Sequence, residues 1–348
     1  MIISIIPDKI GEESYSEKWA FFLKDRGIEF QFVDFSMDDL FEKIRNSDGL
    51  MWRPAHNPDD KQKARRLLLV VEKYLKLPVY PNFNTYWHYD DKVSQYFLFQ
   101  ALNVPTPQTW VFWDKEKALV WAEQARYPLV HKLAVGAGST FVSLINSVEK
   151  AKEVILNDFR GRIPQKTSEF KFSLDKNYLV AIIKRMKESF SFIFKADYPA
   201  FPKYDWQIEK NYSYFQEFLP DNNYDTRVTI IGERAFVFKR WNREDDFRAS
   251  GSGLIDHDLS TVDLECVERA FDISNTSGFQ SMAYDFIRDK HKNVVCEISY
   301  AFNDFAVYNC PGYWDSSLSW HEGHMWPEEA QVEDFLKQIE CKKDTIKS

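Results

Sequence analysis

The chain has 348 residues, of which 44% are hydrophobic and 28% are charged, and its formal net charge is −8. This balance is typical of a globular protein of one to three domains, and the excess of acids argues against general binding to nucleic acid or to anionic membranes. No apolar run reaches the ~18 residues of a membrane-spanning helix, and the opening run is too short for a signal peptide. We therefore expect a cytoplasmic protein without a transmembrane segment.

The first eighty residues alternate between short apolar runs and amphipathic segments. Strands are predicted at 1–6, 28–34, 48–52 and 77–81, and helices at 16–26, 37–46 and 60–76. Alternation with short connections predicts a parallel sheet flanked by helices, whose ligands bind beyond the carboxyl ends of the strands. Arg53 and His56 follow the third strand, where either a ligand contact or an ordinary loop is expected.

The middle of the chain mixes helices with short strands. We predict helices at 88–104, 114–126 and 147–158, and strands at 108–113, 127–133 and 141–145. The stretch 160–211 fits neither this pattern nor the β-rich pattern that follows. Its basic segment 176–195 is interpreted as the solvated face of an inserted subdomain, or as a surface for a membrane or a partner.

From residue 212 onward the sequence is rich in β-strand signals. One strand is predicted at 212–219, one hairpin at 225–241 turning at Gly232 and Glu233, and a second hairpin at 278–300 turning at 289–293. The segment that follows contains His321 and His324. Their spacing is not that of a zinc protease motif, so we expect a substrate-side lid or a structural loop. The four cysteines form no C-x-x-C pair.

Lys132 stands at the start of a loop of small residues between two apolar runs. Gly136, Ala137, Gly138 and Ser139 form this loop. Backbone N–H groups of such a loop approach an anion closely, and a lysine at its edge is a point charge for the same anion. The pattern predicts a flap over phosphates or a plain β-turn, and it is not a Walker loop.

Two acids lie in the second predicted hairpin. Counting back from its turn places Asp285 and Glu297 on one face of adjacent antiparallel strands. Two carboxylates on one face repel unless a cation lies between them, and Mg²⁺ prefers such hard oxygen ligands. An exposed sheet face with ordinary acids is the alternative. Cations gather nearby at Arg227, Lys239 and Arg240 on the first hairpin, followed by Arg248, and they suit phosphate oxygens or a solvated face.

In their order and spacing these segments resemble the ATP-grasp superfamily, and they look closest to its ribosomal-protein glutamate ligases and tubulin tyrosine ligase-like enzymes. The resemblance runs from Asp91 to Asn303, together with the α/β block before it. It implies an α/β and α+β protein, with an ATP-grasp fold preceded by a parallel-sheet α/β domain. The expected units are an N-terminal domain at 1–88, a central subdomain at 89–211 that includes the insertion, a C-terminal subdomain at 212–340 and a tail at 341–348.

The resemblance also implies roles for individual residues. Lys92 and Lys132 would contact phosphates, and residues 136–139 would form the flap. Four residues of a hinge strand would line adenine: Gln216, Glu217, Phe218 and Leu219. Asp225 and Arg227 match a D-x-R element, Lys239 would lie on the nucleotide side, and Arg227 and Arg248 would act near the transferred phosphate. Asp285 and Glu297 match the magnesium carboxylates, and Ser299 stands where asparagine is usual.

The function that this resemblance implies is an ATP- and Mg²⁺-dependent carboxylate–amine ligase. It would form an amide through an acyl phosphate, with an amino acid, a peptide or a sugar acid as substrate. Two Mg²⁺ ions are expected, with Mn²⁺ as a substitute, and the family often forms homodimers. There are two alternatives. One is a non-catalytic nucleotide-binding protein, which Ser299 in place of asparagine favours, and the other is a phosphotransferase on the same fold.

Overall fold

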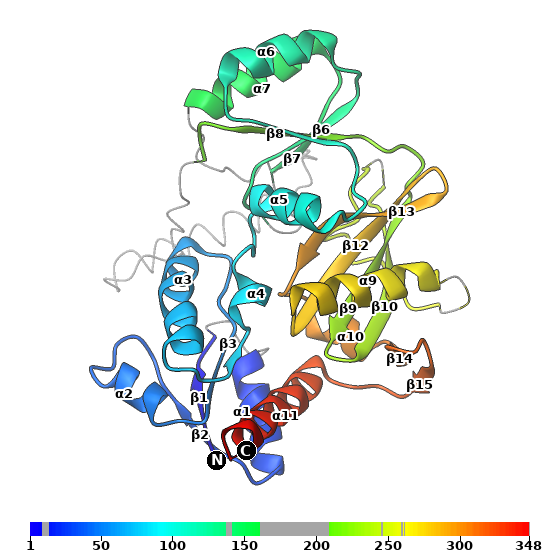
Figure 1. Ribbon diagram of the computed structural model, residues 1–348. Coiled ribbons are helices and arrows are strands. Elements are labelled where there is room, and N and C mark those ends of the chain that lie inside the picture. The colour runs from blue at the N-terminus through cyan, green and yellow to red at the C-terminus, as the bar shows by residue number, and fades with distance from the viewer. Residues whose placement is uncertain are drawn as a thin grey trace, which may run out of the picture.

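The computed structural model describes residues 1–8, 14–136, 141–160, 209–244, 246–258, 260 and 262–347. Ala137, Gly138 and Ser139 lie outside this range, as do most of the predicted insertion and its basic segment 176–195. Among the described residues, no helix combines the length and the apolar character needed to cross a bilayer. The described chain forms three sheets, which lie in separate parts of the molecule (Figure 1).

The first sheet confirms the predicted parallel arrangement. Its strand order is β2-β1-β3-β4, formed by β1 (Ile2–Ile6), β2 (Glu29–Phe32), β3 (Gly49–Trp52) and β4 (Val79–Tyr80). Side chains alternate along these strands. Ile3 and Ile5 pack on α1 (Tyr15–Asp25), whereas Ile6 and Trp52 face α2 (Leu40–Arg45) and α3 (Pro58–Lys73).

The second sheet is antiparallel and has the order β5-β8-β6-β7. Its strands are β5 (Thr109–Phe112), β6 (Leu129–Lys132), β7 (Val142–Ile145) and β8 (Ser213–Glu217). One face is covered by α6 (Lys115–Gln124) and α7 (Val148–Arg160), and the other carries α5 (Lys92–Leu102). Although β8 lies beyond the predicted boundary at 211, it pairs within this sheet, and Phe215 completes the core beneath α6 and α7.

The third sheet has the order β13-β12-β9-β10-β14-β15, with β11 (Ile255–Asp256) paired to β10. Both predicted hairpins are confirmed: β9 (Tyr224–Ile231) with β10 (Arg234–Trp241), and β12 (Ser281–Asp289) with β13 (Lys292–Ser299). The remaining strands are β14 (Gly312–Asp315) and β15 (Trp320–Glu322). One face packs on α9 (Leu264–Ser277), and the other packs on α10 (Asp304–Tyr308).

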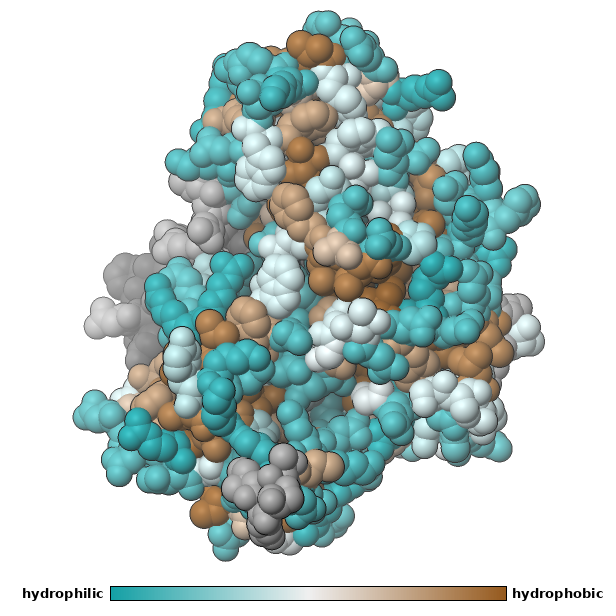
Figure 2. Space-filling view, viewed as in Figure 1, coloured by the Kyte–Doolittle hydropathy of each residue, from teal (hydrophilic) through white to brown (hydrophobic). Residues whose placement is uncertain are grey.

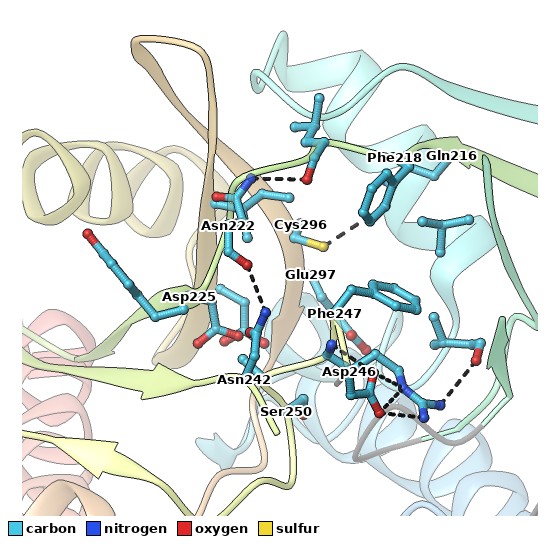
Figure 3. A pocket seen from close by; sticks show the side chains of 18 of the residues that line it. Gln216, Phe218, Asn222, Asp225, Asn242, Asp246, Phe247, Ser250, Cys296 and Glu297 are labelled. Atoms are coloured by element: carbon cyan, nitrogen blue, oxygen red, sulfur yellow. Dashed lines mark hydrogen bonds and ion pairs between the residues drawn. The ribbon is translucent and has the colours of Figure 1, made fainter. Parts of the chain in front are cut away.

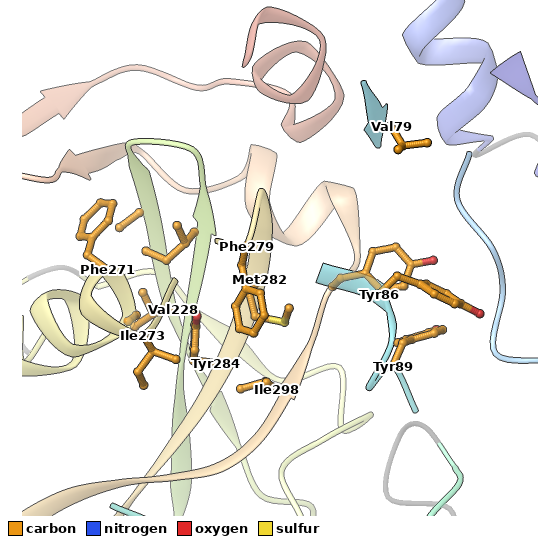
Figure 4. Packing of buried hydrophobic residues seen from close by; sticks show 14 of the residues in the cluster. Val79, Tyr86, Tyr89, Val228, Phe271, Ile273, Phe279, Met282, Tyr284 and Ile298 are labelled. Carbon is orange, nitrogen blue, oxygen red and sulfur yellow. The ribbon is translucent and has the colours of Figure 1, made fainter. Parts of the chain in front are cut away.

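A single apolar cluster joins the first and third sheets. Figure 4 shows it running from Phe271 of α9 through Met282 of β12 to Tyr86 at the end of α4 (Phe83–Tyr86) and to Val79 of β4. Tyr89 and Tyr300 meet edge to face within it, with ring centroids 4.5 Å apart. This shared core holds the two sheets together, so the surface between them is not a free hinge.

The last helix, α11 (Pro327–Lys347), was not predicted, and it replaces the expected tail at 341–348. It leaves the third sheet and returns to the first, where it lies beside α1 near the N-terminus (Figure 1). Val332, Phe335 and Ile339 lie at helical spacing on one face and bury themselves against Trp19 of α1. The pattern is visible in the sequence, but its partner is three hundred residues away along the chain.

Candidate active site

A cavity of about 860 Å³ lies between the second and third sheets. This volume is within the range of small-molecule and cofactor sites. Figure 2 shows apolar side chains gathered near the centre of one face of the molecule, with hydrophilic residues around them. Most of the predicted site residues line the cavity: Lys92, Lys132, Gly136, Gln216, Glu217, Phe218, Leu219, Asp225, Arg248, Asp285 and Glu297.

Lys92, the first residue of α5, joins the start of the predicted flap to a carboxylate of the third sheet. Its Nζ donates to the Gly136 carbonyl at 2.9 Å and lies 3.3 Å from Oε1 of Glu297. The Gly136 N–H donates to Oδ1 of Asp90 at 2.7 Å, and Lys61 binds the other oxygen of Asp90. Gly136 has a φ of 120°, which L side chains rarely adopt. The entry to the flap is thus held at both its N–H and its carbonyl.

Lys132 ends β6 and reaches across the cavity to the third sheet. Its Nζ lies 3.6 Å from Sγ of Cys296 on β13, next to Glu297. Burial raises the pKa of the Cys296 thiol, against the opposing effect of the Lys132 ammonium. Because Lys92 and Lys132 come from different elements and both are almost fully buried, they place two positive charges on one cavity wall.

The hinge strand β8 forms the apolar end of the cavity. The Gln216 amide donates to Oγ1 of Thr109 at 3.1 Å, which fixes its side chain. Phe218 meets Phe247 edge to face at 5.7 Å. In Figure 3, Gln216 and Phe218 lie on one side of the cavity, and Asp225 and Glu297 lie on the other. The cavity therefore has an aromatic end suited to a flat ring and a charged end suited to an anion.

Four charged side chains form one buried cluster on the third sheet: Asp225, Arg227, Arg240 and Asp285. Strand register sets it, because Arg227 lies directly opposite Asp285, and Asp225 lies directly opposite Arg240. Arg227 donates to both oxygens of Asp285 at 2.7 and 2.8 Å. Arg240 donates to both oxygens of Asp225 at 2.8 and 2.6 Å and lies 2.7 Å from Oδ2 of Asp285.

The arginines determine the ionisation of this cluster. Burial alone would raise the pKa of Asp285, but Arg227 and Arg240 hold it well below its usual range. Burial and the nearby Asp285 charge act in the opposite direction on Asp225 and raise its pKa. The two arginines therefore stabilise the charge of Asp285 more strongly than that of Asp225.

The two acids that the sequence suggested as metal ligands are direct cross-strand neighbours, as counting from the turn predicted. Their carboxylate oxygens differ in how many partners they already have. Asp285 already accepts three N–H bonds, whereas Glu297 is one-third exposed at the cavity and pairs with Lys92. Ser299 donates to the Ala301 carbonyl at 2.8 Å instead. This donor set fits one divalent ion at Glu297 and does not fit a two-ion site.

Three predicted residues do not line the cavity. Ser299 is turned toward its own chain, and Arg227 lies against Asp285. Lys239 was expected on the nucleotide side of the sheet, and the structure places it elsewhere. It pairs with Thr226, so strand alternation puts it on the face of the sheet opposite to Arg227, where its Nζ lies over the Tyr224 ring at 4.6 Å. Arg240, the next residue, points to the other face of the sheet and belongs to the charged cluster.

Arg248 lies on the segment between β10 and β11, which covers the cavity. It donates to Asp246 through Nε at 2.8 Å and Nη2 at 2.7 Å, and its Nη1 donates to the Val142 carbonyl of β7 at 3.3 Å. The segment thus bridges the third sheet to the second. Asp246, Asp90 and Cys296 are site residues that the sequence analysis did not name, and it named Arg240 only among the nearby cations. Counting the first hairpin from its turn would have put Arg240 opposite Asp225.

The other candidates lie away from the cavity. Arg53 is half-buried, lies over the Tyr15 ring at 4.2 Å and donates to the Phe302 carbonyl at 3.4 Å, so it joins α1 to the segment after β13. His321, on β15, contacts Asp315 at 2.7 Å, and His324 contacts the Tyr308 carbonyl at 2.8 Å. Within the described ranges, no group of three His, Cys, Asp or Glu residues is arranged to hold a metal ion.

His56 lines a second, smaller cavity of about 300 Å³, with Lys61 and Arg65 of α3. Asp91 and the flap entry at Ala134 and Val135 complete part of its wall. Residues 91–92 and 135–136 therefore separate the two cavities, because each neighbouring pair contributes one residue to either side.

The known proteins that this chain resembles share one fold. No family model matches the chain. It is 22% identical over 221 residues to the alpha-aminoadipate–LysW ligase LysX of Saccharolobus solfataricus, a match that spans 63% of this chain and 64% of that ligase. A RiPP-associated ATP-grasp ligase of Chryseobacterium gregarium, solved with ADP and a leader and core peptide, superposes with a TM-score of 0.60 at 11% identity, covering 97% of both chains.

A RimK domain ATP-grasp protein of Sphaerobacter thermophilus superposes with a TM-score of 0.55 at 12% identity, covering 96% of this chain and 99% of that one. The chain therefore has the ATP-grasp fold, with a parallel-sheet domain before it. The expectation from the sequence is confirmed at the level of the fold.

Proposed function

We propose that this chain is an ATP-dependent ligase that joins a carboxylate to an amine. The observation that carries the proposal is the convergence of Lys92, Lys132 and Arg248 with Glu297 on one cavity between two sheets. In a chain of net charge −8, this local gathering of cations suits a triphosphate. The ATP-grasp fold and the likeness to ligases point in the same direction.

The cavity offers a place for each part of ATP. The adenine ring suits the apolar end at Gln216 and Phe218, and the phosphates suit the charged end at Lys92 and Lys132. Fixed cations in a site shielded from water stabilise charge that moves between phosphate oxygens during transfer. An ion on Glu297 would supply further charge neutralisation to the phosphates when bound.

The reaction would proceed in two steps. The acceptor carboxylate attacks the γ-phosphorus of ATP, the bond to the β-phosphate breaks, and ADP leaves with an acyl phosphate formed. An amine then attacks the acyl carbon and displaces phosphate, which gives an amide and releases a proton. Acyl phosphates hydrolyse readily, so a cover that excludes water is required. Gly136, at the start of the predicted flap, and the segment carrying Phe247 and Arg248 line the cavity and would form part of this cover.

The substrate class includes amino acids, peptides and sugar acids. An ATP-dependent phosphate-release screen with paired acids and amines, followed by mass spectrometry of the product, tests the proposal. A new amide with stoichiometric ADP and phosphate is expected. A stable phosphorylated acid would identify a phosphotransferase instead.

A second candidate is a nucleotide-binding protein without ligase activity. The orientation of Ser299 toward Ala301 favours it, because that position then contributes no oxygen to the phosphates. ATP affinity without substrate-dependent phosphate release, across the same screen, would support this candidate over the ligase.

A further inference from the structure

Asp285 does not present the open oxygens that a bridging metal ligand needs. Its two oxygens accept two N–H bonds from Arg227 and one close contact from Arg240, all at 2.7–2.8 Å. Arg240 also binds both oxygens of Asp225. Two guanidinium groups and two carboxylates cancel, so the cluster carries no surplus negative charge to attract a cation.

The backbone and the burial hold this arrangement in place. Asp225, Arg240 and Asp285 are each no more than 7% exposed, and they face one another across adjacent strands. If Arg240 turned away to free Asp285, Asp225 would remain as a buried charge without its bidentate partner. Removing one member of such a buried pair is strongly destabilising. The cluster is therefore a fixed part of the cavity floor.

The other expected donors leave only one carboxylate for an ion. The Ser299 hydroxyl is bonded to the Ala301 carbonyl, and the Asn303 side chain accepts from the Ala306 N–H at the start of α10. Glu297 remains, with its carboxylate at the cavity and its contact to Lys92 at 3.3 Å. Arg240 lies opposite Asp225 on β10, and across β9 it comes within 2.7 Å of Oδ2 of Asp285.

We infer that this site takes one divalent ion, at Glu297, because Arg227 and Arg240 already occupy the oxygens of Asp285 that a second ion would need. Asp285 is then a positioning residue, which orders Arg227 and Arg240 on the third sheet. The inference rests on the proposed binding of ATP. It departs from the two-ion site that the family resemblance implies, and it makes Arg240 the residue that decides the number of ions.

Counting manganese ions tests the inference without using turnover. The full-length protein is saturated with a non-hydrolysable ATP analogue, and bound Mn²⁺ is measured by equilibrium dialysis and electron paramagnetic resonance. One ion per chain with an uncoupled spectrum is expected. Two ions about 3.5–4 Å apart would give a spin-coupled spectrum, and that result would overturn the inference while leaving ATP binding intact.

Variants of Arg240 test whether this residue limits the number of bound Mn²⁺ ions. Arg240→Ala leaves Asp285 with a single arginine, so a second Mn²⁺ is expected to bind with the analogue. Arg240→Lys keeps the charge and is expected to keep one ion. Arg288→Ala, on the same strand as Asp285 but outside the cavity, is the matched control and should bind one ion.

The possible failures are distinguishable. A count of one ion in a folded Arg240→Ala protein would overturn the role given to Arg240. If Arg240→Ala does not fold, the wild-type count and spectrum still decide the number of ions. An absence of analogue binding in the wild-type protein would overturn the proposed function, and this inference with it.

Discussion

Replacing Glu328 by glutamine should stabilise the protein at neutral pH. Glu328 begins α11 and is fully buried, with neither carboxylate oxygen hydrogen-bonded within the described part of the chain. Lys18 of α1 is 3.5 Å away, but the same ammonium also pairs with Asp304. Burial is the main reason that the pKa of Glu328 rises to about 8, and Asp304 adds to it.

The sign of the effect follows from proton binding. Between pH 4.5, the ordinary value, and pH 8, the folded protein keeps a proton on Glu328 that the unfolded chain has lost. Stability therefore falls as pH rises through this window, by about 1.4 kcal/mol per pH unit. The loss is roughly 3 kcal/mol at pH 7, which Glu328→Gln should largely remove, raising the melting temperature by a few degrees.

Calorimetric melting of both proteins from pH 4.5 to 8.5 measures this effect. The two curves should agree at pH 4.5 and separate steadily up to pH 8. Glu329→Gln is the matched control, because Glu329 is about one-third exposed and pairs with Arg26, so its removal should have a small effect that does not grow in this way. A gap between wild type and Glu328→Gln that stays constant with pH would refute the reasoning.

Three further predictions concern the cavity. Glu297→Ala should lower substrate-dependent phosphate release at least ~100-fold, because it removes the ion's carboxylate, with little change in melting; release at the wild-type rate would refute its role. Lys132→Ala should weaken ATP binding roughly tenfold, about 1.4 kcal/mol, and an unchanged calorimetric affinity would contradict this. Gly136→Ala should weaken ATP binding through the flap, since alanine avoids the φ of 120°; equal affinity and equal phosphate release would show that the conformation there is not needed.

Local patterns predicted most of the elements and part of the site. Turn positions fix hairpin pairing, so counting from a turn correctly placed Asp285 opposite Glu297. The same count, applied to the first hairpin, places Arg240 opposite Asp225 and puts Lys239 on the other face of the sheet. These relations are local, and the alternation of side chains along a strand is sufficient to derive them.

Long-range pairings were not accessible in the same way. The contact of Arg240 with Asp285 depends on β9 lying between β10 and β12, and strand order is not encoded in periodicity. Likewise, nothing local assigns β8 to the second sheet or α11 to the face of α1. The Lys92 contacts join three segments distant in sequence, so the family resemblance suggested the residue but not its partners. The roles given to Ala137, Gly138 and Ser139 stay predictions.

The return of α11 to the N-terminal sheet means that the chain's two ends are folded as one piece. Val332, Phe335 and Ile339 supply part of the hydrophobic core under β1 and β3. A fragment cut after residue 88 would expose that apolar surface, and it should aggregate unless the last helix is added back as a peptide. Grafting the first domain onto another protein therefore requires transferring both terminal segments together.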